Sequence, residues 1–305
     1  MEQNKETIAE QKYIKHIHIE EIWGKHNVDF DLNEDVNILT GVNGVGKTTI
    51  LDIIYSIVSD RYRVSNVESI YKSAVIDLND NLQYKVSTEE TGEKIYELFL
   101  NGKQIDNITQ RIVVVSDIDS NILSPEELQR QQTIDPALRS ELDIKLHEWL
   151  NRYYKYQTGI SNKVQEMIQN QDLEGARKLY EHRDNMKAIC NKLFGPNKEW
   201  VDTEDNTVAF KLKDEQDKVI PVTDLSSGEK HMLILLLSTM VQDNKSNITF
   251  WDEPEMSLHI GWQRQLIRIM RSLNPNMQLL IATHSPEILY EGWEDRVINI
   301  QRIKT

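Results

Sequence analysis

The segment that most constrains this chain is residues 41–48, whose sequence is GVNGVGKT. It fits the pattern G-x-x-x-x-G-K-[ST] of loops that bind phosphate groups. Residues 36–40 before it are apolar enough for a buried strand, and residues 49–58 after it have the composition of a buried helix. In such a strand–loop–helix unit, backbone N–H groups and the positive end of the helix surround an anion. The sequence therefore predicts a nucleotide-binding loop rather than a glycine-rich turn beside a solvated lysine.

Individual side chains of this loop have predicted roles. Lys47 is placed to reach the β- and γ-phosphates of a nucleoside triphosphate, and the Thr48 hydroxyl is placed to hold Mg²⁺. The full set expected to contact the nucleotide from this loop is Asn43, Gly44, Val45, Gly46, Lys47, Thr48 and Thr49.

Charge and composition exclude several classes of protein. The 305-residue chain has a net charge of −14, which argues against nucleic-acid binding over the whole surface but leaves open a local basic groove for DNA. The single cysteine, Cys190, excludes a disulfide framework and a cysteine-based zinc site. The amino-terminal residues lack an apolar signal core, and the longest apolar run, residues 232–240, is far shorter than the roughly 20 residues that span a bilayer. We therefore expect a cytoplasmic protein that does not contact a membrane.

The distribution of strand and helix patterns predicts an α/β fold of the P-loop type, with a mixed central sheet, an antiparallel β subdomain and an inserted helical lobe. β-branched residues 112–115 predict a central buried strand, and a serine and proline at 124–125 predict a helix start. Antiparallel strands are expected at residues 28–32, 74–78, 82–86 and 94–100. We expect an N-terminal ATPase lobe at residues 1–124, a helical lobe at 125–200 and a C-terminal ATPase lobe at 201–305.

Two side-chain groups have alternative interpretations. His16 and His18 alternate with polar residues on a predicted strand, and solvent exposure explains them better than metal binding, because no cysteine or carboxylate cluster joins them. A second group could stack nucleobases or simply pack the helical lobe, and packing is the favoured interpretation. Its members are Trp149, Arg152, Tyr153, Tyr154, Lys155 and Tyr156.

Polar side chains follow two further apolar strands. Asp252 and Glu253 come after the strand expected at residues 248–251, and His284 follows the one at 278–282. Because ligands bind at the carboxyl ends of strands in open α/β sheets, we expect these side chains to meet the P-loop. Asp252 suits a Mg²⁺ contact, Glu253 the deprotonation of an attacking water, and His284 a contact with the γ-phosphate.

Residues 225–230 form a second candidate anion site. Ser226, Ser227, Gly228 and Glu229 open a strongly apolar helix, so that the N-terminus of this helix can face a phosphate. A chain needs only one phosphate cradle of its own. We therefore expect this second one to serve the nucleotide of another subunit.

Together these motifs resemble the ATP-binding cassette ATPase family. Residues 41–48 match its Walker A motif, 248–253 its Walker B motif with the catalytic glutamate, 225–229 its signature loop, and 256–259 its D-loop, while His284 matches its switch histidine. The resemblance implies that ATP and Mg²⁺ are bound and ATP is hydrolysed to ADP and phosphate. It also implies a head-to-tail homodimer, or a higher even oligomer. Ser227 stands where this family usually has glycine, and Gln110 precedes a strand where the family's Q-loop glutamine follows one.

The resemblance is narrowed to the soluble ATPases of the overcoming-lysogenisation-defect type by residues 252–255, 257–259, 262–263 and 283–286. Those of the retron, Septu and PARIS anti-phage systems are similar in style. The resemblance implies a regulator of a separately encoded effector, a nuclease or toxin, because no acidic nuclease cluster follows the ATPase motifs. A RecF- or SbcC-like DNA-repair ATPase is the main alternative, followed by a transporter subunit and a non-hydrolysing nucleotide sensor.

Overall fold

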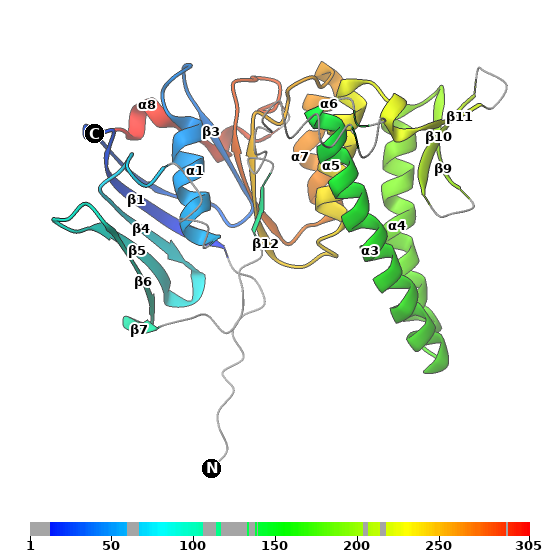
Figure 1. The fold of residues 1–305 in the computed structure, drawn as a ribbon, viewed down its shortest axis with the longest axis horizontal. Helices are drawn as coiled ribbons and strands as arrows, with labels where there is room; N and C mark the ends of the chain where they lie inside the picture. Colours follow the sequence, from blue (N-terminus) through cyan, green and yellow to red (C-terminus); the bar gives the residue numbers. More distant parts are fainter. Residues whose placement is uncertain are drawn as a thin grey trace, which may run out of the picture. The chain divides into compact units, whose positions relative to one another are not determined.

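The computed structural model describes residues 13–59, 67–105, 114–116, 133, 138, 140–203, 207–213, 218–290 and 292–305. The chain forms two compact units (Figure 1). The first unit comprises Met1–Asp119, Lys245–Pro254 and Asn276–Thr305. The second comprises Ser120–Asn244 and Glu255–Pro275. These units do not follow the three consecutive ranges expected from the sequence, because residues 245–254 and 276–305 return to the first unit; the division into three lobes stays a prediction.

The first unit contains a parallel sheet that carries the P-loop. Its strand order is β14-β3-β13-β12-β8, and all described pairs in it are parallel. The strands are β3 (Val36–Thr40), β8 (Val114–Ser116), β12 (Asn247–Asp252), β13 (Met277–Ala282) and β14 (Val297–Asn299). Every residue of β13 is buried, as expected for a parallel strand covered on both faces. Helix α1 (Lys47–Val58) follows β3 and packs against β12 and β13 (Figure 1).

An antiparallel sheet completes the first unit. Its order is β2-β1-β4-β5-β6-β7, and its strands are β1 (Ile14–Ile22), β2 (His26–Asp31), β4 (Ser73–Leu78), β5 (Leu82–Thr88), β6 (Lys94–Leu100) and β7 (Lys103–Ile105). Inward-facing residues of these strands share one hydrophobic core with α1 and the parallel sheet. In β1 the buried residues Ile17 and Ile19 alternate with His16 and His18, which are only partly exposed. Their ring nitrogens lie against Asp29 and Asp31 on β2, and no group of three or more metal-ligating side chains occurs among the described residues.

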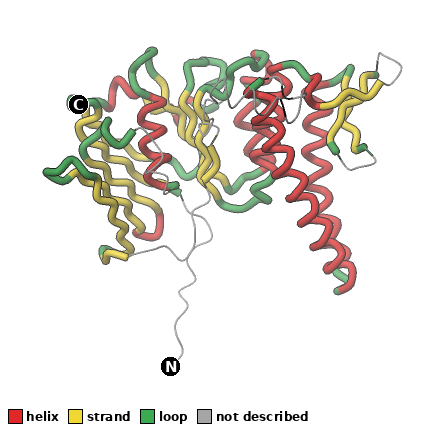
Figure 2. The backbone as a smooth tube through the Cα atoms, in the orientation of Figure 1, coloured by secondary structure: helices red, strands yellow, loops and turns green. Residues whose placement is uncertain are grey.

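The second unit is built on a helical hairpin. Helices α3 (Glu141–Gln169) and α4 (Leu173–Phe194) run side by side (Figure 2). α5 (Ser227–Met240) packs against both, and α7 (Leu266–Leu273) packs against α4 and α5. The second unit also contains α6 (Ile260–Gln263) and an antiparallel sheet of order β11-β10-β9, formed by β9 (Lys198–Asp202), β10 (Val208–Leu212) and β11 (Lys218–Pro221).

The predicted fold class is confirmed, with local corrections. β8 lies at the end of the described strand order, so the expectation of a central strand at residues 112–115 is wrong for its described residues, 114 and 115. β9 was not predicted. The helix start predicted at 124–125 and Gln110 lie outside the described residues.

Candidate functional site

The P-loop connects β3 to α1 through glycines with left-handed backbone. Gly41, Gly44 and Gly46 have φ values of 148°, 76° and 99°. A Cβ atom on Gly46 would lie 2.4 Å from the ring of Trp23, so that a side chain there would be strained and would clash. The loop tip at Asn43 and Gly44 is exposed, as a surface that receives a ligand must be.

Lys47 is buried at the first turn of α1, with 4% of its surface exposed. Its Nζ donates to the carbonyl oxygen of Gly41 at 3.2 Å and lies 2.6 Å from Nε2 of His284. His284 follows β13, which is far from β3 along the chain but adjacent to it in the sheet. The structure therefore brings together two side chains that the sequence placed 237 positions apart.

Thr48 and Asp252 meet at the expected Mg²⁺ position. The Thr48 hydroxyl donates to Oδ1 of Asp252 at 3.0 Å. A hydroxyl and a carboxylate are hard oxygen ligands, and Mg²⁺ is commonly held by one or two protein oxygens together with phosphate oxygens and water. These two residues could hold the metal, because two protein oxygens are enough when phosphate oxygens and water complete the coordination.

Glu253 adjoins the same site. Its backbone φ is 47°, and its N–H donates to the carbonyl oxygen of Ala282 at 2.8 Å, which ties the end of β12 to the end of β13. Its Oε1 lies 3.5 Å from Nε2 of His284. The unusual backbone turn thus directs the Glu253 carboxylate toward the histidine while Asp252 faces Thr48.

The structure adds three residues that the sequence did not single out in the first unit. Burial, together with the charge of Asp252, raises the pKa of Asp52 to about 6. Asp52 lies one helical turn after Thr48, a spacing that could have revealed it. Trp23 covers Gly46, and Lys304 donates to the carbonyl oxygen of Val45 while its Nζ lies 4.8 Å from the Trp23 ring centre. Trp23 and Lys304 are distant from the P-loop in the sequence and contact it only in the folded chain.

The signature segment lies in the second unit, at the N-terminus of α5. Ser226 is the N-cap, and Ser226 and Glu229 form a capping box. The Glu229 carboxylate also accepts hydrogen bonds from Nζ of Lys198 on β9, at 2.6 and 2.7 Å. These contacts lower the pKa of Glu229 despite its burial, so the carboxylate stays ionised and holds the cap.

The D-loop segment packs directly on this cap. A Cβ atom on Gly228 would lie 2.4 Å from the carbonyl oxygen of Ser257, so the two segments approach too closely for a side chain at Gly228. His231, one turn further along α5, hydrogen-bonds the backbone of Met256. The segments that match a signature loop and a D-loop are therefore held together within one unit.

Replacing Lys198 with methionine is expected to destabilise the second unit. It would leave the Glu229 carboxylate, whose side chain is 11% exposed, without its ammonium partner. Removing one member of a buried ion pair costs about 3 kcal/mol. Chemical unfolding followed by tryptophan fluorescence measures this loss, and the double variant K198M/E229M should recover much of it. Equal stability of Lys198→Met and the wild type would contradict the expectation.

The stability of the protein is expected to fall as the pH drops below 6.5, with His231 as one cause. Burial, and secondarily the charge of Lys145, lowers the pKa of His231 from 6.5 to about 4. Between these values the unfolded chain binds a proton that the folded chain does not, so this stability is full above pH 6.5 and is lost toward pH 4, by on the order of 3 kcal/mol. The melting temperature should depend less steeply on pH across this window in His231→Gln than in the wild type. His147→Gln, at an exposed position of α3, should leave this pH dependence unchanged.

Comparison with known proteins identifies the family. A family model described as "AAA domain, putative AbiEii toxin, Type IV TA system" matches residues 36–289. The chain belongs to this AAA ATPase family. The match covers the P-loop, the Asp252–Glu253 pair and His284 in one alignment.

This ATPase chain is similar to a retron protein, a Septu protein and a DNA replication and repair protein. The Retron Ec83 probable ATPase of Escherichia coli is 22% identical, with 92% of this chain and 70% of the relative covered. The Septu protein PtuA of Bacillus thuringiensis is 24% identical, covering 90% and 72%. The DNA replication and repair protein RecF of Clostridium botulinum is 26% identical, covering 78% and 70%. The expected resemblance to ATPases of retron and Septu systems is confirmed.

Solved structures confirm the ATPase fold. The Smc head domain derived from Pyrococcus furiosus aligns with a TM-score of 0.56 at 16% identity, covering 92% of this chain and 91% of that one. At this identity the similarity concerns the fold alone. No helix among the described residues is both long and apolar enough to cross a membrane.

Proposed function

We propose that this ATPase binds ATP with Mg²⁺ and hydrolyses it to ADP and phosphate. The observation that carries the proposal is the convergence of Lys47, Thr48, Asp252, Glu253 and His284 at the carboxyl ends of β3, β12 and β13. These residues come from three separate segments, and each has the chemistry that its place requires.

Each side chain has a proposed task. Lys47 and the backbone of residues 43–49 bind the β- and γ-phosphates, and Thr48 and Asp252 hold Mg²⁺, which neutralises developing charge when bound. Glu253 orients the attacking water and accepts its proton. His284, within reach of both Lys47 and Glu253, contacts the γ-phosphate and distinguishes ATP from ADP.

We further propose that two copies associate head to tail. The N-terminus of α5, with Ser226, Ser227, Gly228 and Glu229, would face the triphosphate held by Lys47 of the other copy. Two features support this role: an exposed serine cap at a helix N-terminus, and a glycine that permits close packing with Ser257. ATP would favour the closed pair because it contacts both surfaces only there, and hydrolysis would release it.

The association is tested with the Glu253→Gln variant, which should bind ATP but retain it. Light scattering after size separation is expected to show a dimer with ATP and Mg²⁺, and a monomer with ADP. A monomer under both conditions, with ATP binding verified by calorimetry, would refute the head-to-tail pair while leaving the nucleotide site intact.

The biological role we propose is control of a separately encoded effector, a nuclease or toxin, in bacterial anti-phage defence in the cytoplasm. The similarity to the Retron Ec83 and Septu proteins supports it. Cells carrying the gene with its neighbouring reading frames should resist phage plating, and Lys47→Ala should abolish that resistance. Full resistance with the Lys47→Ala variant would contradict an ATP-dependent role.

A DNA-repair function is the second candidate, and the similarity to RecF favours it. In that case duplex or single-stranded DNA should stimulate hydrolysis, and the stimulation should fall steeply with salt concentration. The acidic net charge of −14 makes this the weaker candidate.

A further inference from the structure

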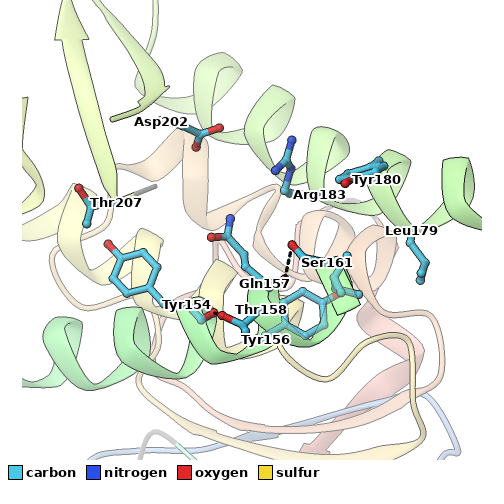
Figure 3. Close-up of a pocket in the computed structure, with 11 residues that line it drawn as sticks. Tyr154, Tyr156, Gln157, Thr158, Ser161, Leu179, Tyr180, Arg183, Asp202 and Thr207 are labelled. Atoms are coloured by element: carbon cyan, nitrogen blue, oxygen red, sulfur yellow. Dashed lines mark hydrogen bonds between the residues drawn. The ribbon is translucent and has the colours of Figure 1, made fainter. Parts of the chain in front are cut away.

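A pocket lies in the second unit, between the two helices of the hairpin and the β9–β10 sheet (Figure 3). Its volume is about 410 Å³, within the range of sites that hold small organic molecules. Tyr154, Gln157, Thr158 and Ser161 recur at helical spacing and line it from α3. Leu179, Tyr180 and Arg183 line it from α4, Asp202 from the end of β9, and Thr207 from just before β10. The nucleotide-binding residues of the first unit take no part in it.

The pocket has a wall of flat and apolar side chains. Tyr156 and Ile160 contribute from α3, and Leu179 and Tyr180 from α4. By contrast, Trp149 and Tyr153 are buried and do not line this pocket, with 7% and 0% of their surfaces exposed. The aromatic cluster seen in the sequence therefore has two parts: Trp149 and Tyr153 pack the interior, as favoured, while Tyr154 and Tyr156 face a cavity.

Arg183 provides an unused hydrogen-bond donor in this pocket. Its Nε atom is buried and has no hydrogen-bond partner among the described residues. Its Nη2 lies 3.7 Å from the exposed carboxylate of Asp184, beyond hydrogen-bond distance, and the guanidinium lies 5.3 Å from the Tyr180 ring centre. A buried donor without a partner is costly, and such a group calls for a ligand or water that accepts from it.

The remaining polar groups define what such a ligand must offer. The Tyr154 hydroxyl accepts from the backbone N–H of Val208, and burial raises its pKa, so it keeps a proton to donate. The Gln157 amide donates to the Tyr153 hydroxyl, and none of the described residues donates to its Oε1. Asp202 is already engaged by Lys187 and by the indole N–H of Trp200. The pocket thus offers the Arg183 Nε and the Tyr154 hydroxyl as donors and the Gln157 Oε1 as an acceptor, with the Arg183 guanidinium near the carboxylates of Asp184 and Asp202.

We propose that this pocket binds a small molecule that joins a flat ring to one anionic group, of the size and chemistry of a nucleoside monophosphate. The Arg183 guanidinium binds the phosphate, because a planar fork of N–H donors matches its oxygens. The ring lies against Tyr156 and Tyr180, and the Gln157 carbonyl oxygen accepts from a ring amino group. The site is separate from the ATP site and would remain even if the protein did not hydrolyse ATP.

Calorimetric titration with AMP, GMP, CMP and UMP tests this site, using Lys47→Ala chains so that the P-loop does not contribute. At least one monophosphate is expected to bind with a dissociation constant below about 1 mM, and more tightly than its nucleoside or inorganic phosphate alone. Arg183→Gln should weaken that binding about 10- to 100-fold, as loss of a hydrogen bond to a charged group does. Arg177→Gln, at an exposed arginine of α4 paired with Glu181, is the matched control and should bind as before.

A second variant tests whether the ligand binds in the pocket itself. Ser161→Trp at the exposed rim should block the pocket, whereas Asn162→Trp, the neighbouring exposed residue that does not line it, should not. Thermal melting of each variant verifies that it folds. Absence of binding of all four monophosphates to folded protein, binding unaffected by both Arg183→Gln and Ser161→Trp, or equally tight binding of phosphate alone would each overturn the proposal.

Discussion

Replacing Glu253 with glutamine is expected to lower ATP turnover by at least about 100-fold, the lower end of what a general base contributes, while ATP binding persists. The glutamine keeps the size of the side chain and can still orient water, but it cannot accept the proton. The backbone of Glu253, with φ of 47° and its N–H bonded to Ala282, does not depend on the charge of the carboxylate, so the fold should survive. Phosphate release measured at saturating ATP gives the turnover, and calorimetry gives the affinity.

The matched control is Glu294→Gln, at an exposed position of the same unit. Its turnover should equal that of the wild type. If Glu253→Gln retains more than about a tenth of the wild-type turnover, another group is the base, and the role assigned to Glu253 is wrong.

The second large effect is expected from mixing two inactive variants. Lys47→Ala should lose ATP binding, and Ser226→Asp should keep its helix cap, since Asp is a good N-cap residue, while its charge repels a facing triphosphate. In a head-to-tail pair each site takes Lys47 from one copy and Ser226 from the other. A mixed dimer of the two variants therefore contains one intact site, and an equal mixture should regain about a quarter of the wild-type turnover.

The mixture also has an internal control. Ser226→Asn caps the helix equally well without adding charge, so it should retain more turnover than Ser226→Asp. If the mixture of Lys47→Ala and Ser226→Asp stays as inactive as either variant alone, although both fold and associate, the signature segment does not act on the partner's nucleotide. If Ser226→Asp alone is fully active, the serine has no role in hydrolysis.

Local patterns predicted most of what surrounds the ATP site. β3, α1, β12 and β13 are each encoded by a short apolar segment that ends in a polar motif, and their parallel pairing brings Lys47, Asp252 and His284 together. The positions of these three residues could therefore be predicted from the sequence. Each residue ends or follows a strand, and the parallel pairing of the strands brings their carboxyl ends together.

Other parts of the site depend on contacts between distant segments. Lys198 lies on β9, whose sequence KEWVD has too few apolar residues to predict a strand. The ion pair of Lys198 with Glu229 could therefore not be predicted. Lys304 reaches the P-loop because Thr305 and Asn27 exchange backbone hydrogen bonds. Arg183 and Tyr154 come from different helices, so no spacing within one segment could predict their pocket.

The two ion pairs at the start of α5 join it to both arms of the hairpin. Lys230 is paired with the buried Asp143 at the first turn of α3, at 2.7 Å, and Glu229 with Lys198, just beyond α4. A sliding motion of one arm past the other would pull these neighbouring residues in different directions. The serine at the N-terminus of α5 would move with them, so a relative motion of α3 and α4 would change the position of the signature segment. A molecule bound between α3 and α4 would prevent that motion.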